Sequence, residues 1–237
     1  MSDILIIGAS SGIGFETAKI LSKHENVIMV SNNESRITNA AKLLNSQSYS
    51  CDFTNEEQVK ELFKELLKKY NITKAVFCCG KGFISEIINT NLSDWEEMIK
   101  VNATSAFLFL KYILPAFYEN KNGDIILIGS EAGIQGFPTY SAYCAGKFAL
   151  TGLVESVKQE ARLNGVRINI IHPGDVNTPF MDKCPIDLNL MKKYDIKVCE
   201  KKDMLKPETI ADLIVYLLQQ EKNVFIPNIT ILPEDYE

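Results

Sequence analysis

The sequence predicts an α/β fold, in which a doubly wound, seven-stranded and mostly parallel sheet carries helices on both faces. Short apolar segments alternate with amphipathic helical segments along the whole chain, and this order is typical of βαβ units. Several of these segments are apolar throughout, which favours strands that are covered on both sides. Because neither a linker nor an internal repeat divides the chain, we expect one domain over residues 1–237.

The strands are expected where β-branched and other apolar residues cluster between turn residues. The candidates are Ile4–Ile7, Val27–Ser31, Ser48–Cys51, Ala75–Cys78, Asp124–Gly129, Arg167–Ile171 and, near the end, either Val224–Ile226 or Ile229–Leu232. Two capping-box signals predict where helices begin. Thr54 with Glu57 precedes an amphipathic helix over Asn55–Tyr70, and Ser93 with Glu96 precedes a second, longer helix.

Composition and charge exclude several classes of protein. The 237 residues are 46% hydrophobic and 23% charged, with a formal net charge of -5. These values are ordinary for a globular protein and provide no basic face for nucleic acid. The longest apolar segments are broken within about six residues, far short of the roughly 20 that cross a bilayer. We therefore expect no nucleic-acid partner and no membrane partner.

The cysteines and histidines show no spacing typical of a metal site. The six cysteines include no Cys-x-x-Cys pair, and only His24 and His172 could supply an imidazole. The chain starts with Met-Ser-Asp and enters an apolar segment without the basic segment of a signal peptide. We expect reduced thiols in a cytoplasmic protein, and no metal.

The first expected strand leads into a glycine turn and then into a helix. Gly8, Gly12 and Gly14 follow Ile4–Ile7. Glycines at these positions let the backbone turn sharply and approach a pyrophosphate, whose charge then lies at the N-terminus of the helix. Because the turn stands at the start of the βαβ alternation, it predicts a Rossmann-like dinucleotide site rather than a bare structural turn.

The Gly-x-x-x-Gly-x-Gly spacing of this turn and the Tyr143-x-x-x-Lys147 motif further on resemble the short-chain dehydrogenase/reductase family. The resemblance runs from Ile4 to about Leu232 and includes other motifs in the order that the family has. They are Cys51-Asp52-Phe53-Thr54, Val101-Asn102-Ala103, Ile128-Gly129-Ser130 and Pro173-Gly174-Asp175-Val176-Asn177-Thr178. The resemblance implies an oxidoreductase that transfers a hydride between a nicotinamide dinucleotide and a ketone or secondary alcohol.

The resemblance also implies roles for individual residues. The implied catalytic residues are Asn102, Ser130, Tyr143 and Lys147. Asn102 would hold a water that links Lys147 to solvent, the Asp52 carboxylate would contact the adenine amino group, and Thr178 would contact the nicotinamide carboxamide. The residues expected to bind the cofactor are Gly8, Ser10, Ser11, Gly12, Ile13, Gly14, Ser31, Asn32, Asp52, Phe53, Cys79, Gly80, Asn102, Tyr143, Lys147, Pro173, Gly174, Val176 and Thr178.

The sequence departs from the family's pattern at three places. Ile7 stands where threonine is common, and Phe77-Cys78-Cys79-Gly80 replaces the family's Asn-Asn-Ala-Gly. The C-terminal end reads Ile231-Leu232-Pro233 instead of Asp-Gly-Gly. The family forms dimers through the helices that correspond to residues around 94–118 and 142–163. The resemblance therefore implies a homo-oligomer, and the altered C-terminal end leaves the choice between homodimer and homotetramer open.

The spacing of Tyr143 and Lys147 supports the implied chemistry, because residues four apart on a helix share one face. A tyrosine with a pKa of ~10 is a poor acid or base at neutral pH. The Lys147 ammonium, with an oxidised nicotinamide, is expected to lower the pKa of Tyr143 by about two to three units. Tyr143 then exchanges a proton with the substrate oxygen, and Ser130 hydrogen-bonds the same oxygen from a strand end.

The segment after the second strand decides between NAD and NADP. Ser31 and Asn32 are neutral, so the carboxylate that favours NAD is missing. The arginine that often marks NADP preference is missing at Asn32 and at Ser11, and Arg36 is expected on the following helix. We predict NADP(H) as the cofactor, with NAD(H) as the alternative.

Residues 180–205 have weak periodicity, and seven lysines lie between Lys183 and Lys206. A segment of this length inside a compact domain is often functional, so we expect a lid over the substrate. The lysines could attract an acidic carrier protein or a CoA ester, although a solvated loop is the simpler interpretation. The substrate is then a small ketone or alcohol, and the resemblance suggests a 3-oxoacyl thioester as one candidate.

Two other functions fit the same motifs. A dinucleotide-binding sensor or scaffold would keep the cofactor site without turnover, but the intact Ser130, Tyr143 and Lys147 count against it. An isomerase, dehydratase or epimerase on the same scaffold would not consume the nicotinamide cofactor stoichiometrically.

Overall fold

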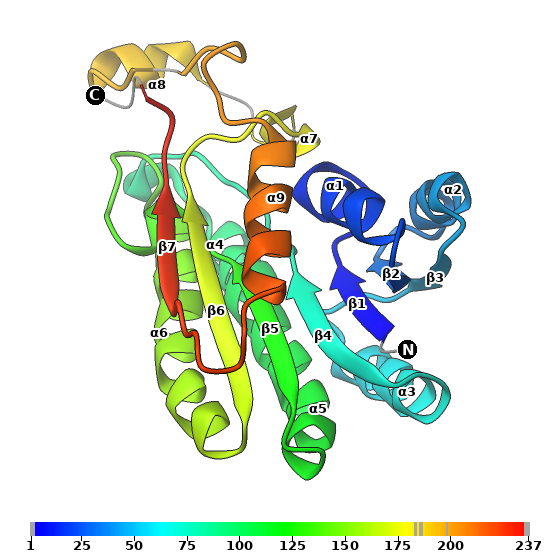
Figure 1. The fold of residues 1–237 in the computed structure, drawn as a ribbon. Helices are drawn as coiled ribbons and strands as arrows, with labels where there is room; N and C mark the ends of the chain where they lie inside the picture. Colours follow the sequence, from blue (N-terminus) through cyan, green and yellow to red (C-terminus); the bar gives the residue numbers. More distant parts are fainter. Residues whose placement is uncertain (1–2, 183, 185–186, 198, 235–237) are drawn as a thin grey trace.

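Seven strands form one parallel sheet within residues 3–182, 184, 187–197 and 199–234, which this computed structural model describes (Figure 1). They are β1 (Asp3–Ile7), β2 (Asn26–Ser31), β3 (Gln47–Ser50), β4 (Ile72–Phe77), β5 (Gly123–Ile128), β6 (Val166–Pro173) and β7 (Asn228–Ile231). Their order is β3-β2-β1-β4-β5-β6-β7, and all neighbours are parallel. The predicted Rossmann-like fold is confirmed. The last strand matches the Ile229–Leu232 candidate, and the Val224–Ile226 candidate is wrong.

Helices cover both faces of this sheet. They are α1 (Gly12–Leu21), α2 (Glu34–Leu44), α3 (Glu56–Lys69), α4 (Leu92–Ile99), α5 (Ser105–Glu119), α6 (Ser141–Leu163), α7 (Pro179–Asp182), α8 (Leu188–Lys193) and α9 (Pro207–Leu218). In β1, Ile4 and Ile6 pack with α1, α2 and α9, whereas Leu5 and Ile7 pack with α3, α5 and α6. Alternate residues of one strand therefore enter two separate cores, which explains why this segment is apolar throughout.

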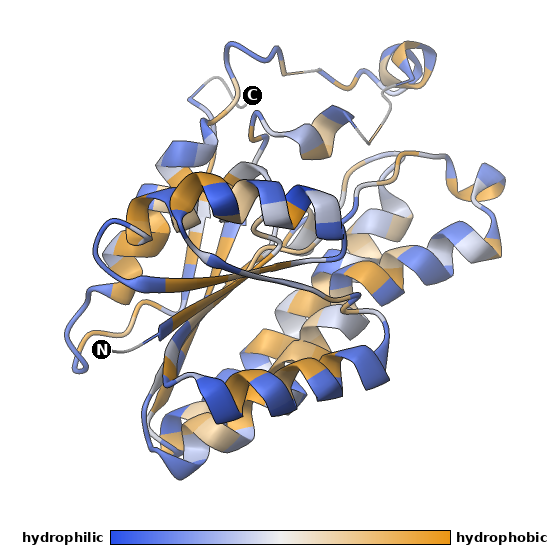
Figure 2. Ribbon diagram, turned by 90° about the vertical axis from the view of Figure 1, so that its right-hand side faces the viewer, coloured by the Kyte–Doolittle hydropathy of each residue, from blue (hydrophilic) through white to orange (hydrophobic). Residues whose placement is uncertain are grey.

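The distribution of hydropathy agrees with this arrangement. Figure 2 shows strands that are largely hydrophobic, lying between helices whose outward surfaces are mostly hydrophilic. Each helix of this kind gains its stability from the apolar stripe that it presents to the sheet. The helices cover the two faces of the sheet, so the edge at which the strands end is occupied by loops.

The helix after β3 begins one residue later than predicted, at Glu56. Asn55 is its N-cap, and the Asn55 side-chain oxygen accepts a hydrogen bond from the Gln58 N–H at 3.2 Å. The predicted capping box that starts at Thr54 is therefore wrong. The Thr54 hydroxyl donates instead to the Asp52 carboxylate at 2.8 Å. Asparagine caps a helix at least as well as threonine, and the turn at Asp52 already uses the threonine hydroxyl.

The long helical segment before β5 is divided into α4 and α5 by a π-helical segment, Lys100–Thr104. Ser93 lies inside the first turn of α4, after the N-cap residue Asn91, so the second predicted capping box is also wrong. A π-helical turn redirects the side chains that it carries and is frequent at functional sites. Here it contains Asn102.

The order of the strands places a crevice at one edge of the sheet. β2 and β3 lie on one side of β1, while β4 to β7 lie on the other side. At such a switch point the loops after the two central strands, β1 and β4, diverge and leave room for a ligand. Apart from Asn102, the residues singled out in the sequence follow the strand ends at this edge or lie on α6 beside it.

Candidate active site

One crevice at the carboxyl edge of the sheet brings together nearly all of the predicted site residues. Its volume is about 1380 Å³, and its walls come from the loops after β1 to β6, from α6 and from the segment around α7. Every residue predicted to bind the cofactor lines this crevice except Asn102. Asn102 is fully buried and lies behind the wall.

The glycine turn has the backbone that its sequence predicts. Gly8 and Gly12 have φ angles of +81° and +56°, which L-residues rarely adopt. A Cβ on Gly14 would lie 2.5 Å from the Gly8 carbonyl oxygen, so only glycine permits β1 and α1 to approach this closely. Within the described residues, the N–H groups of Gly12, Ile13 and Gly14 have no acceptor, and the N-cap Ser11 supplies none. These donors at a helix N-terminus suit a phosphate group.

The segment after β2 presents neutral polar groups to the crevice. Ser31 and Asn32 line it. The Asn33 side chain caps α2 by accepting the Arg36 N–H at 2.9 Å. Arg36 lies in the first turn of α2 and does not line the crevice, in agreement with the prediction that it belongs to the helix.

Asn102 supports the loop that follows β4. Its Nδ2 donates to the carbonyls of Lys81 at 2.9 Å and of Met98 at 3.1 Å, and its Oδ1 accepts the Lys81 N–H at 3.2 Å. A Cβ on Gly80 would lie 3.2 Å from this Oδ1 and 3.3 Å from the Lys147 Nζ. The buried amide therefore holds the loop against the lysine, and the absence of a side chain at Gly80 leaves room for both groups.

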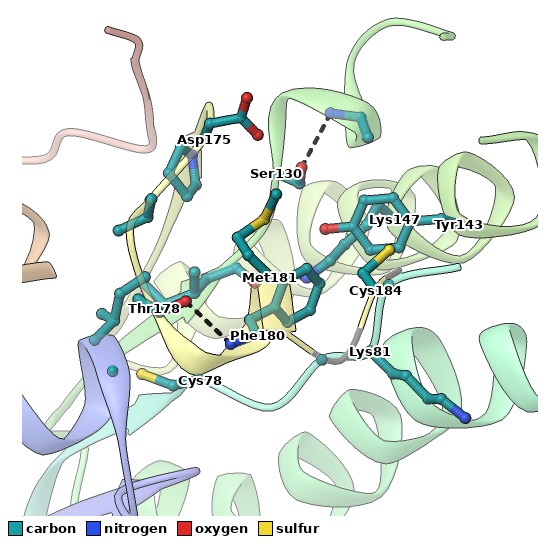
Figure 3. Close-up of a pocket in the computed structure, with 18 of the residues that line it drawn as sticks. Cys78, Lys81, Ser130, Tyr143, Lys147, Asp175, Thr178, Phe180, Met181 and Cys184 are labelled. Carbon is teal, nitrogen blue, oxygen red and sulfur yellow. Dashed lines mark hydrogen bonds between the residues drawn. The ribbon is translucent and has the colours of Figure 1, made fainter. Parts of the chain in front are cut away.

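Ser130, Tyr143 and Lys147 come together from the end of β5 and from α6 (Figure 3). The Ser130 hydroxyl oxygen accepts the Ala132 N–H at 3.1 Å. Tyr143 and Lys147 share one face of α6 and are only 8% and 3% exposed. The Lys147 Nζ donates to the Ile128 carbonyl at 3.2 Å and lies 5.9 Å from the centre of the Tyr143 ring.

Burial shifts the pKa of both helix residues. Desolvation lowers the pKa of Lys147 to about 8, while the nearby thiols of Cys79 and Cys78 oppose this change. Desolvation also raises the pKa of Tyr143, and the Ser130 hydroxyl opposes that rise. In the chain without a cofactor the pKa of Tyr143 is therefore raised, and the lowering expected with an oxidised nicotinamide stays a prediction. The Lys147 ammonium is directed at the Ile128 carbonyl, and the largest effect on the pKa of Tyr143 is the loss of water around its buried hydroxyl.

Aromatic rings form a continuous row beside Tyr143. The ring centroids of Phe137 and Tyr140 are 6.3 Å apart, those of Tyr140 and Tyr143 are 6.4 Å apart, and those of Tyr143 and Phe180 are 6.1 Å apart. All four residues line the crevice. This part of the crevice can therefore bind an apolar or cationic group next to the reactive hydroxyl.

Several residues that the sequence did not single out also line the crevice. They are Asp175, Phe180, Met181 and Cys184. The sequence signal that could have identified Asp175 as a site residue was its position inside the Pro173–Thr178 motif. Phe180 and Met181 belong to α7, and Cys184 lies just after it. In this segment the weak periodicity gave no indication of which side chains turn inward.

The segment predicted as a lid lies beyond the carboxyl ends of the strands and contains α7 and α8 (Figure 1). The Lys193 Nζ and the Tyr194 hydroxyl both donate to the Glu86 carboxylate, each at 2.5 Å. These bonds tie the end of α8 to the loop between β4 and α4. Lys183, at the start of the lysine-rich segment, lies outside the described residues.

Other features of the described residues are relevant to the candidate chemistry. No three His, Cys, Asp or Glu side chains of the described residues gather as a metal site would require. Among the same described residues, none of the helices has the length and apolarity that crossing a bilayer requires. The six cysteines, all within the described residues, form no disulfide bonds.

Comparison with known proteins identifies the family to which the chain belongs. A family model described as short chain dehydrogenase matches residues 2–188. An uncharacterised oxidoreductase of Staphylococcus epidermidis is 30% identical over 233 residues, which are 97% of this chain and 96% of that protein. The chain therefore belongs to the short-chain dehydrogenase family, whose named relatives here are oxidoreductases.

Solved structures agree with the fold. An alcohol dehydrogenase of the archaeon Thermococcus sibiricus, complexed with 5-hydroxy-NADP, has a TM-score of 0.84 at 23% identity and covers 100% of this chain and 98% of its own. An actinorhodin polyketide ketoreductase variant with NADPH has a TM-score of 0.86 at 22% identity, with 98% of this chain and 96% of that one covered. At sequence identities of 22% and 23%, these similarities show that the fold is shared.

Replacement of Gly14 with alanine should separate α1 from β1. The added Cβ would lie 2.5 Å from the Gly8 oxygen, and overpacking of this kind costs about 1–3 kcal/mol. We expect the midpoint of thermal unfolding to fall by roughly 2–10 °C and the affinity for a nicotinamide dinucleotide to fall with it.

Gly152→Ala on α6 is the matched control for this substitution. A Cβ at Gly152 meets nothing within 4 Å, so alanine should stabilise the helix by up to about 1 kcal/mol and leave dinucleotide affinity unchanged. Equal effects of the two substitutions on unfolding and on dinucleotide titration would contradict the close approach at Gly14.

Because the pKa of Lys147 is lowered in the folded protein, we predict that the free energy of unfolding depends on pH. The unfolded chain keeps this proton up to about pH 10.4, whereas the folded protein begins to lose it at about 8. The unfolded state therefore binds more protons between these values, and the free energy of unfolding should rise with pH. From about pH 7.5 to 9.5 the rise should be about 2 kcal/mol relative to Lys147→Met. Urea unfolding of both proteins measures this difference, and a flat or falling difference would refute the shift.

Proposed function

We propose that this protein transfers a hydride between NADP(H) and a ketone or secondary alcohol, with Tyr143 as general acid and base. The observation that carries the proposal is that Ser130, Tyr143 and Lys147 share one crevice with the glycine turn. A dinucleotide at that turn extends along the sheet edge toward the catalytic residues. The family relationship supports the same reaction class.

The residues along the crevice fit the parts of a dinucleotide. The free N–H groups at the start of α1 suit the pyrophosphate. Asp52 and Phe53 suit the adenine end, and Pro173, Gly174, Val176 and Thr178 suit the nicotinamide end. When bound, the nicotinamide supplies or accepts the hydride, which no amino-acid side chain can do.

The proton and the substrate oxygen are handled by side chains of this chain. Because burial raises its pKa, Tyr143 keeps its proton and can donate it to a carbonyl oxygen during reduction. We assign to Ser130 a hydrogen bond to the same oxygen, which stabilises the charge that develops there. The Lys147 ammonium stabilises the phenolate that remains, and Asn102 is assigned to a water between Lys147 and solvent.

NADP(H) is preferred over NAD(H) because the segment after β2 presents no carboxylate to the crevice. Ser31 and Asn32 line this position, and their neutral side chains can hydrogen-bond a 2′-phosphate without repelling it. Solved relatives that are described with NADP or NADPH support the same choice. The lack of an arginine at Asn32 leaves room for weaker binding of NAD(H).

We further propose a homo-oligomer, either a homodimer or a homotetramer, located in the cytoplasm. Large apolar side chains stand exposed on the helices through which the family dimerises. They are Trp95 on α4, Phe107 on α5 and Phe148 on α6, at 36%, 46% and 46%. Burial of these side chains against a second copy would remove apolar surface from water. Cysteines without disulfide bonds fit a reducing compartment.

Replacement of Tyr143 with phenylalanine removes the proposed proton donor without changing the shape of the ring. We expect kcat for carbonyl reduction to fall by about a hundredfold or more, while affinity for NADPH stays nearly unchanged. The loss of absorbance of the reduced nicotinamide over a panel of ketones measures turnover.

Tyr140→Phe is the matched control, because Tyr140 belongs to the same aromatic row but has Cys144 one turn on instead of a lysine. This variant should keep most of the activity. A sensor or scaffold would show no turnover in the unaltered protein, and an isomerase or epimerase would convert substrate without consuming NADPH. Either result would overturn the proposed reaction.

Thermal unfolding with each cofactor tests the choice of NADP(H). A ligand at a hundredfold excess over its dissociation constant adds about 2.7 kcal/mol to stability, which is roughly 5–10 °C for a protein of this size. At equal concentrations, NADP(H) should raise the unfolding midpoint more than NAD(H). The reverse order would show that the cofactor assignment is wrong.

A further inference from the structure

The crevice carries an excess of acidic side chains among the described residues. The acidic ones are Asp52, Glu97, Glu131, Asp175, Asp195, Glu200, Asp203 and Glu234, and the basic ones are Lys81, Lys147 and Lys197. Asp52 is assigned to the adenine end, Glu97 pairs with Lys81 at 2.6 Å, and Glu200 pairs with Lys202 at 3.0 Å. The other carboxylates come from the loops after β5 and β6, from the lid and from the C-terminal segment. The substrate end of the crevice is therefore the acidic end.

The lysines of the lid offset this excess only in part, because Lys197 lines the crevice and Lys202 pairs with Glu200 at 3.0 Å. Lys193 pairs with Glu86 and Lys201 pairs with Asp182, and neither lysine lines the crevice. Lys192 is exposed and also lies outside the lining. Of the described lysines of this segment, Lys192, Lys193 and Lys201 therefore lie outside the crevice lining, and Lys197 lines the crevice among more numerous carboxylates.

Asp175 is the most informative of the acidic residues. It follows Gly174 in the loop after β6 and is half-buried. Within the described residues, no group donates a hydrogen bond to its carboxylate and no cation pairs with it. Desolvation raises the pKa of Asp175. A carboxylate that has lost part of its hydration and has no partner gains most from a ligand that supplies a positive charge.

The aromatic row lines the same crevice as this carboxylate. Asp175, Tyr140 and Phe180 all line the same crevice, and the ring centroid of Phe180 lies 6.1 Å from that of Tyr143. Figure 3 shows the Asp175 carboxylate and the Tyr143 hydroxyl on opposite sides of Ser130 and Met181. Aromatic faces attract cations, and rings combined with a carboxylate are the usual way to bind an ammonium group.

We propose that the substrate carries a positively charged nitrogen, as an amine or a quaternary ammonium, and that Asp175 binds this charge across the crevice from Tyr143. The proposal rests on the proposed function and adds the class of substrate. Asp175 is then a specificity-determining residue that contacts substrate away from the reacting carbon. The rings of Tyr140 and Phe180 cover the apolar parts of the charged group. An anionic thioester would meet the same carboxylate at a cost in affinity.

Three ketones of matched length test this class. They are 5-(trimethylammonio)pentan-2-one, its neutral carbon isostere 6,6-dimethylheptan-2-one, and the anion 5-oxohexanoate. Calorimetric titration of each ketone into the protein measures binding without turnover, and kcat/KM with NADPH measures use. The cation should bind about ten- to hundredfold tighter than the isostere, and the anion should bind weakest.

Variants separate the role of Asp175 from a structural one. Asp175→Asn should remove most of the preference for the cation while leaving kcat/KM for the neutral isostere nearly unchanged, and Asp175→Glu should restore the preference. Asp212→Asn, on the exposed face of α9, is the control that removes one charge outside the crevice and should change neither value. An unfolding midpoint equal to that of the unaltered protein shows that Asp175→Asn folds.

The outcomes distinguish this inference from the proposed function. If the isostere or the anion binds as tightly as the cation, or if Asp175→Asn weakens all three ketones equally, the inference is wrong even when the protein reduces ketones. If the cation binds through Asp175 but no ketone is reduced with either cofactor, the site for a cation stands and the proposed reaction is wrong.

Discussion

The candidate active site depends on one buried ammonium. Lys147 can lie between α6 and the end of β5 because the Ile128 carbonyl accepts one of its hydrogens and because Gly80 leaves the space that a side chain would fill. The cost of this burial appears as a pKa lowered to about 8. The same exclusion of water raises the pKa of Tyr143, so the phenol holds its proton until a substrate or a cofactor changes the local field.

Close backbone approach is the second constraint on the crevice. Gly14 lets α1 begin directly against the end of β1, and the resulting helix N-terminus leaves N–H groups that need an acceptor. On the other side of the switch point, Asn102 uses its whole amide to hold the loop after β4. The π-helical turn that contains Asn102 places the amide there. The close backbone approach at Gly14 and the buried amide of Asn102 therefore fix the loops on both sides of the crevice without a ligand.

Local sequence signals were reliable where a single physical cause acted. The apolar segments predicted the strands, since strands buried on both faces admit few polar residues, and the i, i+4 spacing predicted the shared face of Tyr143 and Lys147. Sequence signals failed where two neighbouring residues could form the same interaction. Thr54 has the chemistry of an N-cap, but the turn at Asp52 uses its hydroxyl and Asn55 caps the helix instead. A capping motif cannot show which of two adjacent polar residues the turn will use.

The sequence by itself determined the sheet, the glycine turn and the residues that gather at its edge, because these follow from periodicity, from backbone freedom and from spacing along one element. The tertiary structure alone decided the direction of the Tyr143 pKa and the position of Asp175 in the crevice. Both depend on the packing of residues that are far apart in the chain. Phe180 of the lid, for example, lies against Tyr143 of α6 and helps to exclude water from its hydroxyl. Desolvation is a property of the packed assembly of side chains, and no local pattern records it.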